Sequence, residues 1–393
     1  MSLPLSGIRV LDLSRYLPGP LCTQMLADYG AEVIKVEDPQ GGDLGRSLTP
    51  MVAGLSALFY TVNRNKQSLT LNLKHPQGQD IFRQLVKDSD VVVEQFRPGV
   101  MKRLGLDYSA LKEINPGLVY CAISSYGQTG PLSHCAGHEI NYLGLSGVMK
   151  LTGGLQGQPV MPGVQIAGIS GGTHHAVIAI LMALMHRQNT GLGQFCDVSI
   201  MDGTITLLAY ALGEWSALGR LPVLGEEFLS GGYACYNVYQ CKDDEYMSLA
   251  AVEERFWAVF CSRLKLPRFI PEQWNPSFQA EMKAEISRVI RLKDRADWEK
   301  AFAGLDICFT PVLNLDEMIH YPQVKARDMI HQVGNVRGSG LDIAVTGLPI
   351  KLSASPGQVQ LCFPELGEHN QEILGAAGYS EEELRVLKEK GII

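Results

Sequence analysis

The chain has 393 residues, of which 46% are hydrophobic and 19% are charged, values that are ordinary for a globular protein. This length exceeds what one hydrophobic core usually organises, so we expect two domains. The formal net charge of −7 argues against non-specific binding to nucleic acid, which needs a basic surface.

The cysteines are scattered, and the sequence has neither a CxxC pair nor a Cys/His metal spacing. We therefore expect free thiols, no metal site and a cytoplasmic location. Met1 to Arg9 lacks the basic start and apolar run of a signal peptide. The longest apolar stretch, Ala176 to Met185, is too short to span a bilayer. We predict a buried helix there and no membrane association.

The first third of the chain alternates predicted strands and helices. An apolar run at 8–13 predicts a strand, 22–29 has helical periodicity, and 32–37 predicts the next strand. Such a βαβ unit implies parallel strands joined by a right-handed crossover. The pattern continues with predicted strands at 67–73, 91–95 and 118–124 and predicted helices at 77–87 and 108–115. The expected fold class is therefore α/β with a parallel sheet.

The character of the sequence changes after about residue 219. Before this point the pattern predicts a helix at 171–187, a strand at 195–198 and a helix at 201–213. Beyond it, the pattern predicts strands at 233–240 and 245–251 and helices at 253–263, 278–290 and 296–304. We therefore predict a large domain of residues 1–220 and 326–393, with a smaller α+β domain of residues 221–325 inserted into it.

The first predicted strand-to-helix turn, Ser14 to Pro20, is not a GxGxxG loop, so the sequence gives no reason to expect NAD. The free N–H groups of the following helix could bind an anion, and a purely structural turn is an equal alternative.

Basic residues cluster near other predicted strands, at Arg64 and Lys66 and at Arg97, Lys102 and Arg103. With the neighbouring aromatic ring of Phe96, they could hold a nucleotide by stacking on its base and neutralising its phosphates. The alternative is a solvated, charged face.

The most informative polar segment surrounds His138, which follows a glycine and opens an apolar helix. A lone histidine is usually structural, but the carboxylate of Glu139 beside it favours acid/base chemistry. Glu253 lies at a predicted strand-to-helix junction. It is either an ordinary helix-start residue or a hydrogen-bond partner for a catalytic histidine.

Five segments together resemble the family III CoA-transferases, also called the CaiB/BaiF superfamily, over nearly the whole chain. They are Pro4 to Glu37, Asn63 to Lys74, Glu94 to Gly99, Ser125 to Pro131 and Leu366 to Asn370. Two further segments are similar to the α-methylacyl-CoA racemase branch: GHEINYLGLSG around His138, and Leu229 through Glu253.

The resemblance implies a Rossmann-like large domain, a small inserted domain and an interlocked homodimer, or a heteromer with a homologous subunit. It implies an acyl-CoA substrate whose coenzyme A is part of the substrate, with no covalently bound cofactor. Asp38 stands where relatives often carry an arginine for the nucleotide phosphate. By matching position, the CoA site would contain Tyr16, Leu71, Lys74, Gln95, Phe96, Arg97 and Arg103.

For the chemistry, the resemblance implies that His138, paired with Glu253, and an aspartate act on opposite faces of the substrate α-carbon. The enolate oxygen would be stabilised by backbone N–H groups. In the transferases, the corresponding aspartate instead attacks the thioester. That aspartate should fall at Gly168, which has no side chain to offer.

Three hypotheses follow from Gly168. A substitute group such as Glu139 could serve, whereas the amide of Gln165 cannot act as a base, and His174 and His175 lie roughly 9–10 Å further along a helix. A partner subunit could supply the aspartate. Gly168 could also be a variant or engineered position in an otherwise ordinary enzyme. The leading prediction is racemisation or epimerisation of a 2-methylacyl-CoA, and the alternative is transfer of CoA to a carboxylic acid.

Overall fold

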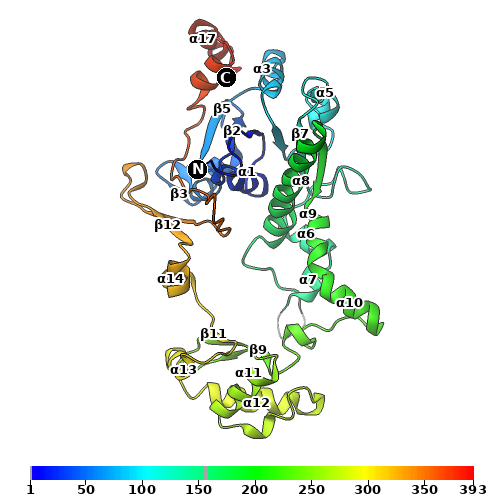
Figure 1. Cartoon of the computed structure of the whole chain (residues 1–393), viewed down its shortest axis with the longest axis vertical. Helices are drawn as coiled ribbons and strands as arrows, with labels where there is room; N and C mark the ends of the chain where they lie inside the picture. Colours follow the sequence, from blue (N-terminus) through cyan, green and yellow to red (C-terminus); the bar gives the residue numbers. More distant parts are fainter. Residues whose placement is uncertain (1, 154–157) are drawn as a thin grey trace. The chain divides into compact units, whose positions relative to one another are not determined.

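The computed structural model describes residues 2–153 and 158–393. It contains two compact units, labelled by their elements in Figure 1. The first unit comprises Met1–Val148, Pro162–Leu208 and Pro322–Ile393, and the second comprises Met149–Met161 and Ala209–Tyr321. Both ends of the chain therefore belong to the first unit.

The first unit is built on a six-stranded parallel sheet with the order β5-β2-β1-β6-β7-β8. Ranked by position in the chain, the strands run 3-2-1-4-5-6, the order of dinucleotide-binding folds. The predicted α/β fold with a parallel sheet is confirmed. The strands are β1 (Arg9–Asp12), β2 (Glu32–Glu37), β5 (Lys66–Thr70), β6 (Val91–Glu94), β7 (Val119–Ser124) and β8 (Phe195–Ser199).

Helices cover both faces of this sheet, which accounts for the burial of most of its strand residues. On one face, strand residues such as Leu11 and Ile34 form a single core with Phe82 and Leu374. This face is covered by α3 (Pro76–Lys87), α4 (Val100–Arg103), α5 (Tyr108–Leu111), α16 (Asn370–Ala376) and α17 (Glu381–Glu389). The other face is covered by α1 (Pro18–Asp28) and α8 (His175–Thr190), which runs alongside β7 (Figure 1).

The second unit is a small α+β structure with its own core, as predicted. Its antiparallel strands are β9 (Tyr236–Gln240), β10 (Tyr246–Ala250) and β11 (Phe309–Pro311). Its helices include α10 (Ala209–Leu218), α11 (Glu254–Arg263), α12 (Gln279–Ile290), α13 (Arg295–Phe302) and α14 (Leu315–His320). Trp257 and Phe260 are fully buried and stack in its centre.

The remaining elements are short. They are the strands β3 (Met51–Val52), β4 (Leu55–Ser56), β12 (Ile330–Val333) and β13 (Ile343–Thr346), and the helices α2 (Ala57–Val62), α6 (Glu139–Leu145), α7 (Val148–Leu151), α9 (Ile200–Ile205) and α15 (Pro322–Ala326). Short 3₁₀ turns include η1 (Leu44–Ser47), η3 (Thr206–Leu208) and η4 (Phe228–Ser230).

The helix predicted at 171–187 begins earlier and is not regular. A π-helix, η2 (Ala167–His174), runs directly into α8. Glycine allows η2 to approach α9 closely, because a Cβ on Gly171 would lie 2.4 Å from the carbonyl oxygen of Ile200. The helix predicted at 201–213 is likewise divided into α9, η3 and α10.

The prediction that 176–185 is a buried helix is wrong for one side of α8. Ile178 is 46% exposed, and Met182 and Met185 are each 65% exposed. Together with η2, the helix spans Ala167–Thr190, and among the described residues it alone is long and apolar enough to cross a membrane. Of its most apolar stretch of 18 residues, 44% is buried. The core helix of a globular protein can have the same length and composition.

Candidate active site

A pocket of about 140 Å³ opens at the carboxyl ends of β1, β2, β5 and β6. The order of the sheet reverses between β1 and β6, and ligands of doubly wound folds bind at such a switch point. Leu71, Lys74 and Phe96, three of the predicted CoA-binding residues, line this pocket. Asp38 lines it as well.

The pocket also contains Arg15, which the sequence interpretation missed. Its guanidinium carbon lies 5.0 Å from the centre of the Phe96 ring, a cation–π contact. Arg15 follows the end of β1, and this position after a parallel strand was the signal that could have identified it. A cation and an aromatic ring side by side at the mouth of this pocket could bind a nucleotide, because the cation pairs with phosphate and the ring stacks on the base.

The other predicted CoA residues do not line this pocket. Tyr16 has a left-handed backbone (φ 63°), and its N–H donates to the Asp43 carboxylate at 3.0 Å. The side-chain oxygen of Gln95 accepts a hydrogen bond from the N–H of Gly19 at 3.2 Å. Arg97 and Arg103 are exposed. Their contact with CoA stays a prediction.

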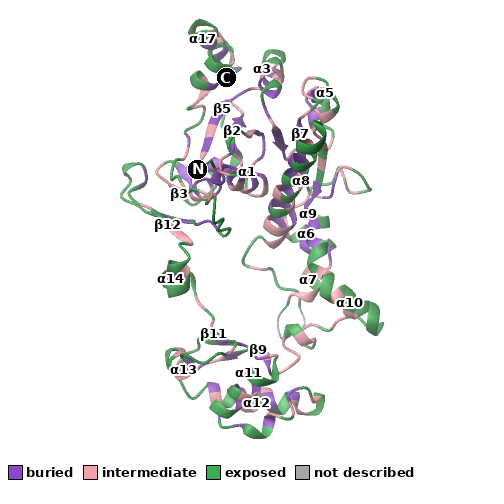
Figure 2. Ribbon diagram, in the orientation of Figure 1, coloured by how far each residue is buried: buried purple, intermediate pink, exposed green. Residues whose placement is uncertain are grey.

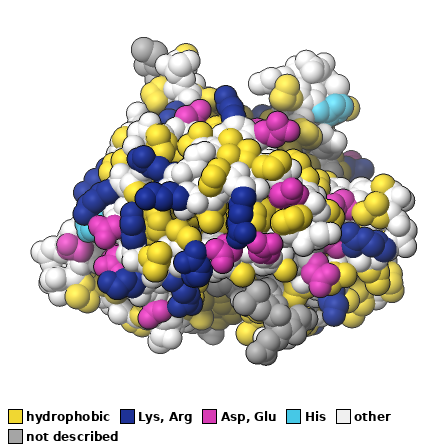
Figure 3. All heavy atoms as spheres, turned by 90° about the horizontal axis from the view of Figure 1, so that it is seen from below, with side chains coloured by type: hydrophobic (Ala, Val, Ile, Leu, Met, Phe, Trp, Pro, Cys, Tyr) yellow, Lys and Arg dark blue, Asp and Glu magenta, His cyan; other side chains and the backbone are white. Residues whose placement is uncertain are grey.

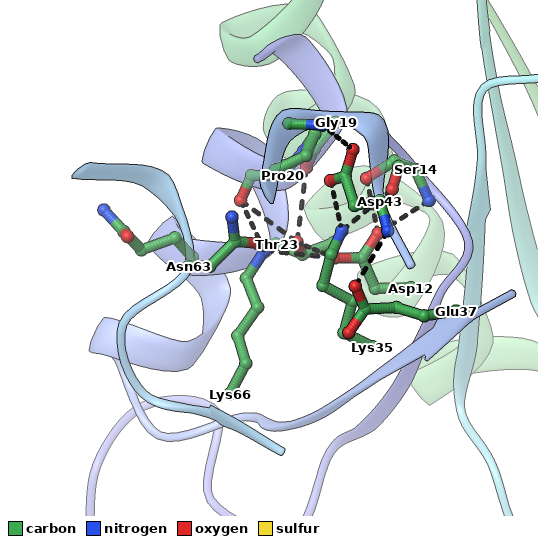
Figure 4. A network of polar contacts seen from close by, with 12 residues as sticks. Asp12, Ser14, Gly19, Pro20, Thr23, Lys35, Glu37, Asp43, Asn63 and Lys66 are labelled. Atoms are coloured by element: carbon green, nitrogen blue, oxygen red, sulfur yellow. Dashed lines mark hydrogen bonds and ion pairs between the residues drawn. The ribbon is translucent and has the colours of Figure 1, made fainter. Parts of the chain in front are cut away.

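A buried charged network supports the turn between β1 and α1 (Figure 4). The fully buried Asp12 carboxylate accepts hydrogen bonds from the Ser14 N–H at 2.9 Å, the Thr23 hydroxyl at 2.7 Å and the Lys66 ammonium at 3.0 Å. Burial alone would raise the pKa of Asp12, but Lys66 and Lys35 hold it well below its usual value. Burial lowers the pKa of Lys66 to about 8 despite the attraction of Asp12.

The ion pair between Lys35 and Asp43 extends this network. The Lys35 ammonium donates to the Ser14 carbonyl at 2.9 Å and lies 2.9 Å from the Asp43 carboxylate. Asp43 in turn binds the N–H of Tyr16. The turn that carries Arg15 and Tyr16 is therefore held in place by the buried ion pairs of Lys66 and Lys35.

The proposed basic cluster at Arg64 and Lys66 is wrong, because neither side chain is available to a phosphate. Arg64 is 2% exposed and pairs with Asp28 at 2.8 Å. Lys66 is 3% exposed and pairs with Asp12. Both cations serve to satisfy buried carboxylates.

His138 is the residue before α6, and it is exposed. Its N–H donates to the side-chain oxygen of Asn141 at 3.0 Å. The hydroxyl of Tyr142 donates to the carbonyl of Gly137 and lies 2.9 Å from the Ser125 hydroxyl. The backbone on both sides of His138 is thus held, and within the part of the chain that the structure describes no carboxylate forms an ion pair with its imidazole.

Glu139 begins α6 and reaches the start of η2. Its carboxylate accepts hydrogen bonds from the N–H of Ala167 at 2.6 Å and from the N–H of Gly168 at 2.8 Å. A Cβ on Gly168 would lie 3.3 Å from Oε2 of Glu139. The carboxylate of Glu139 therefore lies beside the position where a side chain of residue 168 would begin.

Glu253 lies in the second unit, directly before α11, and is exposed. His138 lies in the first unit. The predicted pairing of these two residues stays a prediction.

Most of the cysteine thiols are buried or half-buried. All nine cysteines are free, and burial raises the pKa of the Cys196 thiol to about 11. In residues 2–153 and 158–393, no three His, Cys, Asp or Glu side chains are grouped to hold a metal ion.

The family model described as CoA-transferase family III matches residues 5–370. The chain is 35% identical to the alpha-methylacyl-CoA racemase of Homo sapiens over 396 residues, covering 99% of this chain and 97% of the relative. It is 31% identical to the succinyl-CoA–L-malate CoA-transferase beta subunit of Chloroflexus aurantiacus, covering 100% and 98%. The crystal structure of a CaiB/BaiF family protein from Brucella suis aligns with a TM-score of 0.84 at 30% identity, covering 96% of this chain and 100% of that one.

Proposed function

Since the chain belongs to CoA-transferase family III, we propose that it processes acyl-CoA thioesters and that its reaction is racemisation or epimerisation of a 2-methylacyl-CoA. The coenzyme would bind in the pocket at the carboxyl ends of β1, β2, β5 and β6, with Arg15, Lys74 and Phe96 near its nucleotide. The observation that carries the choice of reaction is Gly168. A transferase reaction needs a nucleophile on the protein, and glycine supplies none, whereas racemisation needs no covalent bond to the protein and can use any acid/base group within reach on each face of the α-carbon.

His138 is the proposed base. A proton next to a thioester carbonyl can be removed because the resulting enolate spreads its charge onto the carbonyl oxygen. An exposed imidazole suits this task when hydrogen bonds hold its backbone and, among the described residues, no carboxylate forms an ion pair with it. The similarity to the human racemase supports racemisation as the reaction.

The test is exchange of the α-proton of 2-methylacyl-CoA with deuterium from solvent, followed by proton NMR. We expect exchange by the native chain and, in His138→Gln, a loss of roughly 10²–10⁴-fold for the enantiomer whose α-proton faces His138. Exchange at the buffer rate in the native protein would refute the proposed reaction.

The second candidate function is CoA transfer by a heteromer in which this chain is the subunit without the aspartate. The similarity to a transferase beta subunit favours it. The test is hydroxylamine trapping of an acyl-enzyme in a complex purified from the source cells. An adduct on a co-purified homologous subunit would support this alternative, and its absence would count against it.

We also propose that the chain forms a homodimer. The support is the apolar face of α8, where Met182 and Met185 are exposed, and α10, which has no buried residue (Figure 2). Such surfaces on a single chain mark interfaces. On the face seen in Figure 3, acidic, basic and hydrophobic side chains are intermixed.

A further inference from the structure

We infer that Glu139 is the second acid/base group of this site and acts from α6 at the place where Gly168 offers no side chain. The inference rests on the proposed racemisation, because inverting a carbon centre by proton transfer needs one group on each face. It adds to that proposal the identity of the group opposite His138.

The position of the carboxylate is the first argument. A Cβ built on Gly168 has as its three nearest heavy atoms Oε2 of Glu139 at 3.3 Å, Cγ of Pro18 at 3.5 Å and Cβ of Gln165 at 3.9 Å. Of these three residues, only Glu139 has an ionisable side chain. Its carboxylate therefore lies next to the space that a side chain at residue 168 would occupy.

The way in which the carboxylate is held is the second argument. Glu139 is the first residue of α6 and directly follows His138, so both groups lie at the start of the same helix. The carboxylate is fixed by the two N–H groups of η2, and it is only half-buried.

The other candidates for this role are less suitable. Nδ1 of His175 lies 2.8 Å from the carbonyl of Ser170 and is engaged there. His174 is exposed on the helix after Gly168. An amide such as that of Gln165 cannot accept a proton at neutral pH.

The proton balance is as follows. In one direction, His138 takes the α-proton, the C–H electron pair becomes the enolate, and protonated Glu139 returns a proton to the opposite face. In the reverse direction, the Glu139 carboxylate takes the proton and the His138 imidazolium returns one. Each turnover leaves the two groups in exchanged protonation states, which solvent resets. The reaction therefore needs no oxidant, nucleophile or further reactant.

The test compares both enantiomers of a 2-methylacyl-CoA in deuterated water, with exchange followed by NMR and configuration by chiral chromatography. In Glu139→Gln we expect racemisation to fall roughly 10²–10⁴-fold. Exchange should persist for the enantiomer whose proton faces His138 and be lost for the other. His138→Gln should show the opposite preference, and Glu113→Gln, which changes an exposed carboxylate of the same unit, should behave like the native chain.

A purely structural role for Glu139, as a cap of η2, would reduce exchange of both enantiomers equally, and that result would overturn the inference. Unchanged racemisation in Glu139→Gln, with activity lost in His138→Gln, would also overturn it and leave the proposed function standing. A native chain that exchanges the α-proton of neither enantiomer would contradict both the inference and the proposed function. The double variant Glu139→Gln with Gly168→Asp should regain racemisation, because it restores one carboxylate at the same place.

Discussion

The backbone N–H of Gly168 donates to the carboxylate of Glu139 at 2.8 Å, which joins the start of η2 to the start of α6. Gly171, three residues further along η2, faces α9 instead. These two glycines have different surroundings, so substitutions at the two positions should have different effects on stability.

Gly171→Ala should be destabilising, whereas Gly168→Ala should be tolerated. A Cβ on Gly171 would lie 2.4 Å from the Ile200 carbonyl oxygen and 2.9 Å from the Thr204 nitrogen, which are backbone atoms that cannot move aside. Overpacking of this kind costs about 1–3 kcal/mol. At Gly168 the nearest atom is 3.3 Å away and ends a flexible side chain. Urea unfolding of the two variants measures the difference, and equal losses would contradict this account.

Asp12→Ala should lower the free energy of unfolding by about 3–5 kcal/mol, because it leaves the buried ammonium groups of Lys66 and Lys35 without their shared partner. Asp80→Ala is the matched control, since the Asp80 side chain is 72% exposed and pairs with Arg83 on the surface. We expect a change below about 1 kcal/mol there. Chemical denaturation at pH 7 checks both, and a small loss in Asp12→Ala would show that the network contributes little.

The alternating pattern was sufficient to predict a parallel α/β sheet because βαβ units are local in sequence. The roles of Arg64 and Lys66 could not be predicted in the same way. Their carboxylate partners, Asp28 and Asp12, lie 36 and 54 residues earlier in the chain. Only the tertiary fold shows that these charges are buried and paired.

The candidate site was likewise only partly predictable from the sequence. A resemblance between sequences indicated His138, Lys74 and Phe96 by position, and it indicated that Gly168 lacks the expected carboxylate. It could not show that Glu139 reaches the N–H of residue 168, because that contact spans 29 residues and depends on how α6 meets η2.

Arg15→Ala should weaken binding of coenzyme A. The guanidinium lies over Phe96 at the mouth of the pocket, and a charged hydrogen bond from it to a phosphate would contribute about 1.5–3 kcal/mol, or roughly 10- to 150-fold in Kd. Isothermal titration calorimetry with coenzyme A is the measurement. Lys112→Ala, an exposed cation on the same unit, should bind as the native chain does, and equal weakening in both variants would point to general charge rather than to this pocket.

The double variant Met182→Glu with Met185→Glu should be a monomer. Both methionines are 65% exposed on α8, and two carboxylates in the centre of an apolar interface would be buried without partners. Sedimentation velocity of the native and variant chains measures the change. A native chain that sediments as a monomer would contradict the homodimer and favour assembly with a different subunit.

Glu94→Gln should make the stability of the fold less dependent on pH. Burial raises the pKa of Glu94 to about 8 from an ordinary value of 4.5, although its carboxylate also accepts the N–H of Phe96 at 2.6 Å. Between these two values the folded chain holds a proton that the unfolded chain has released, so the contribution of Glu94 to stability is complete below pH 4.5 and is lost as pH rises to about 8.

The amide that replaces the Glu94 carboxyl group in this variant stays neutral and can still accept the Phe96 N–H. The stability of the variant relative to the native chain should therefore increase with pH by up to about 1.4 kcal/mol per unit between about pH 5 and pH 8. Urea unfolding at both pH values gives the comparison, with Glu113→Gln as an exposed control that should follow the native chain. A constant difference between Glu94→Gln and the native chain across this range would mean that Glu94 is already ionised in the folded protein.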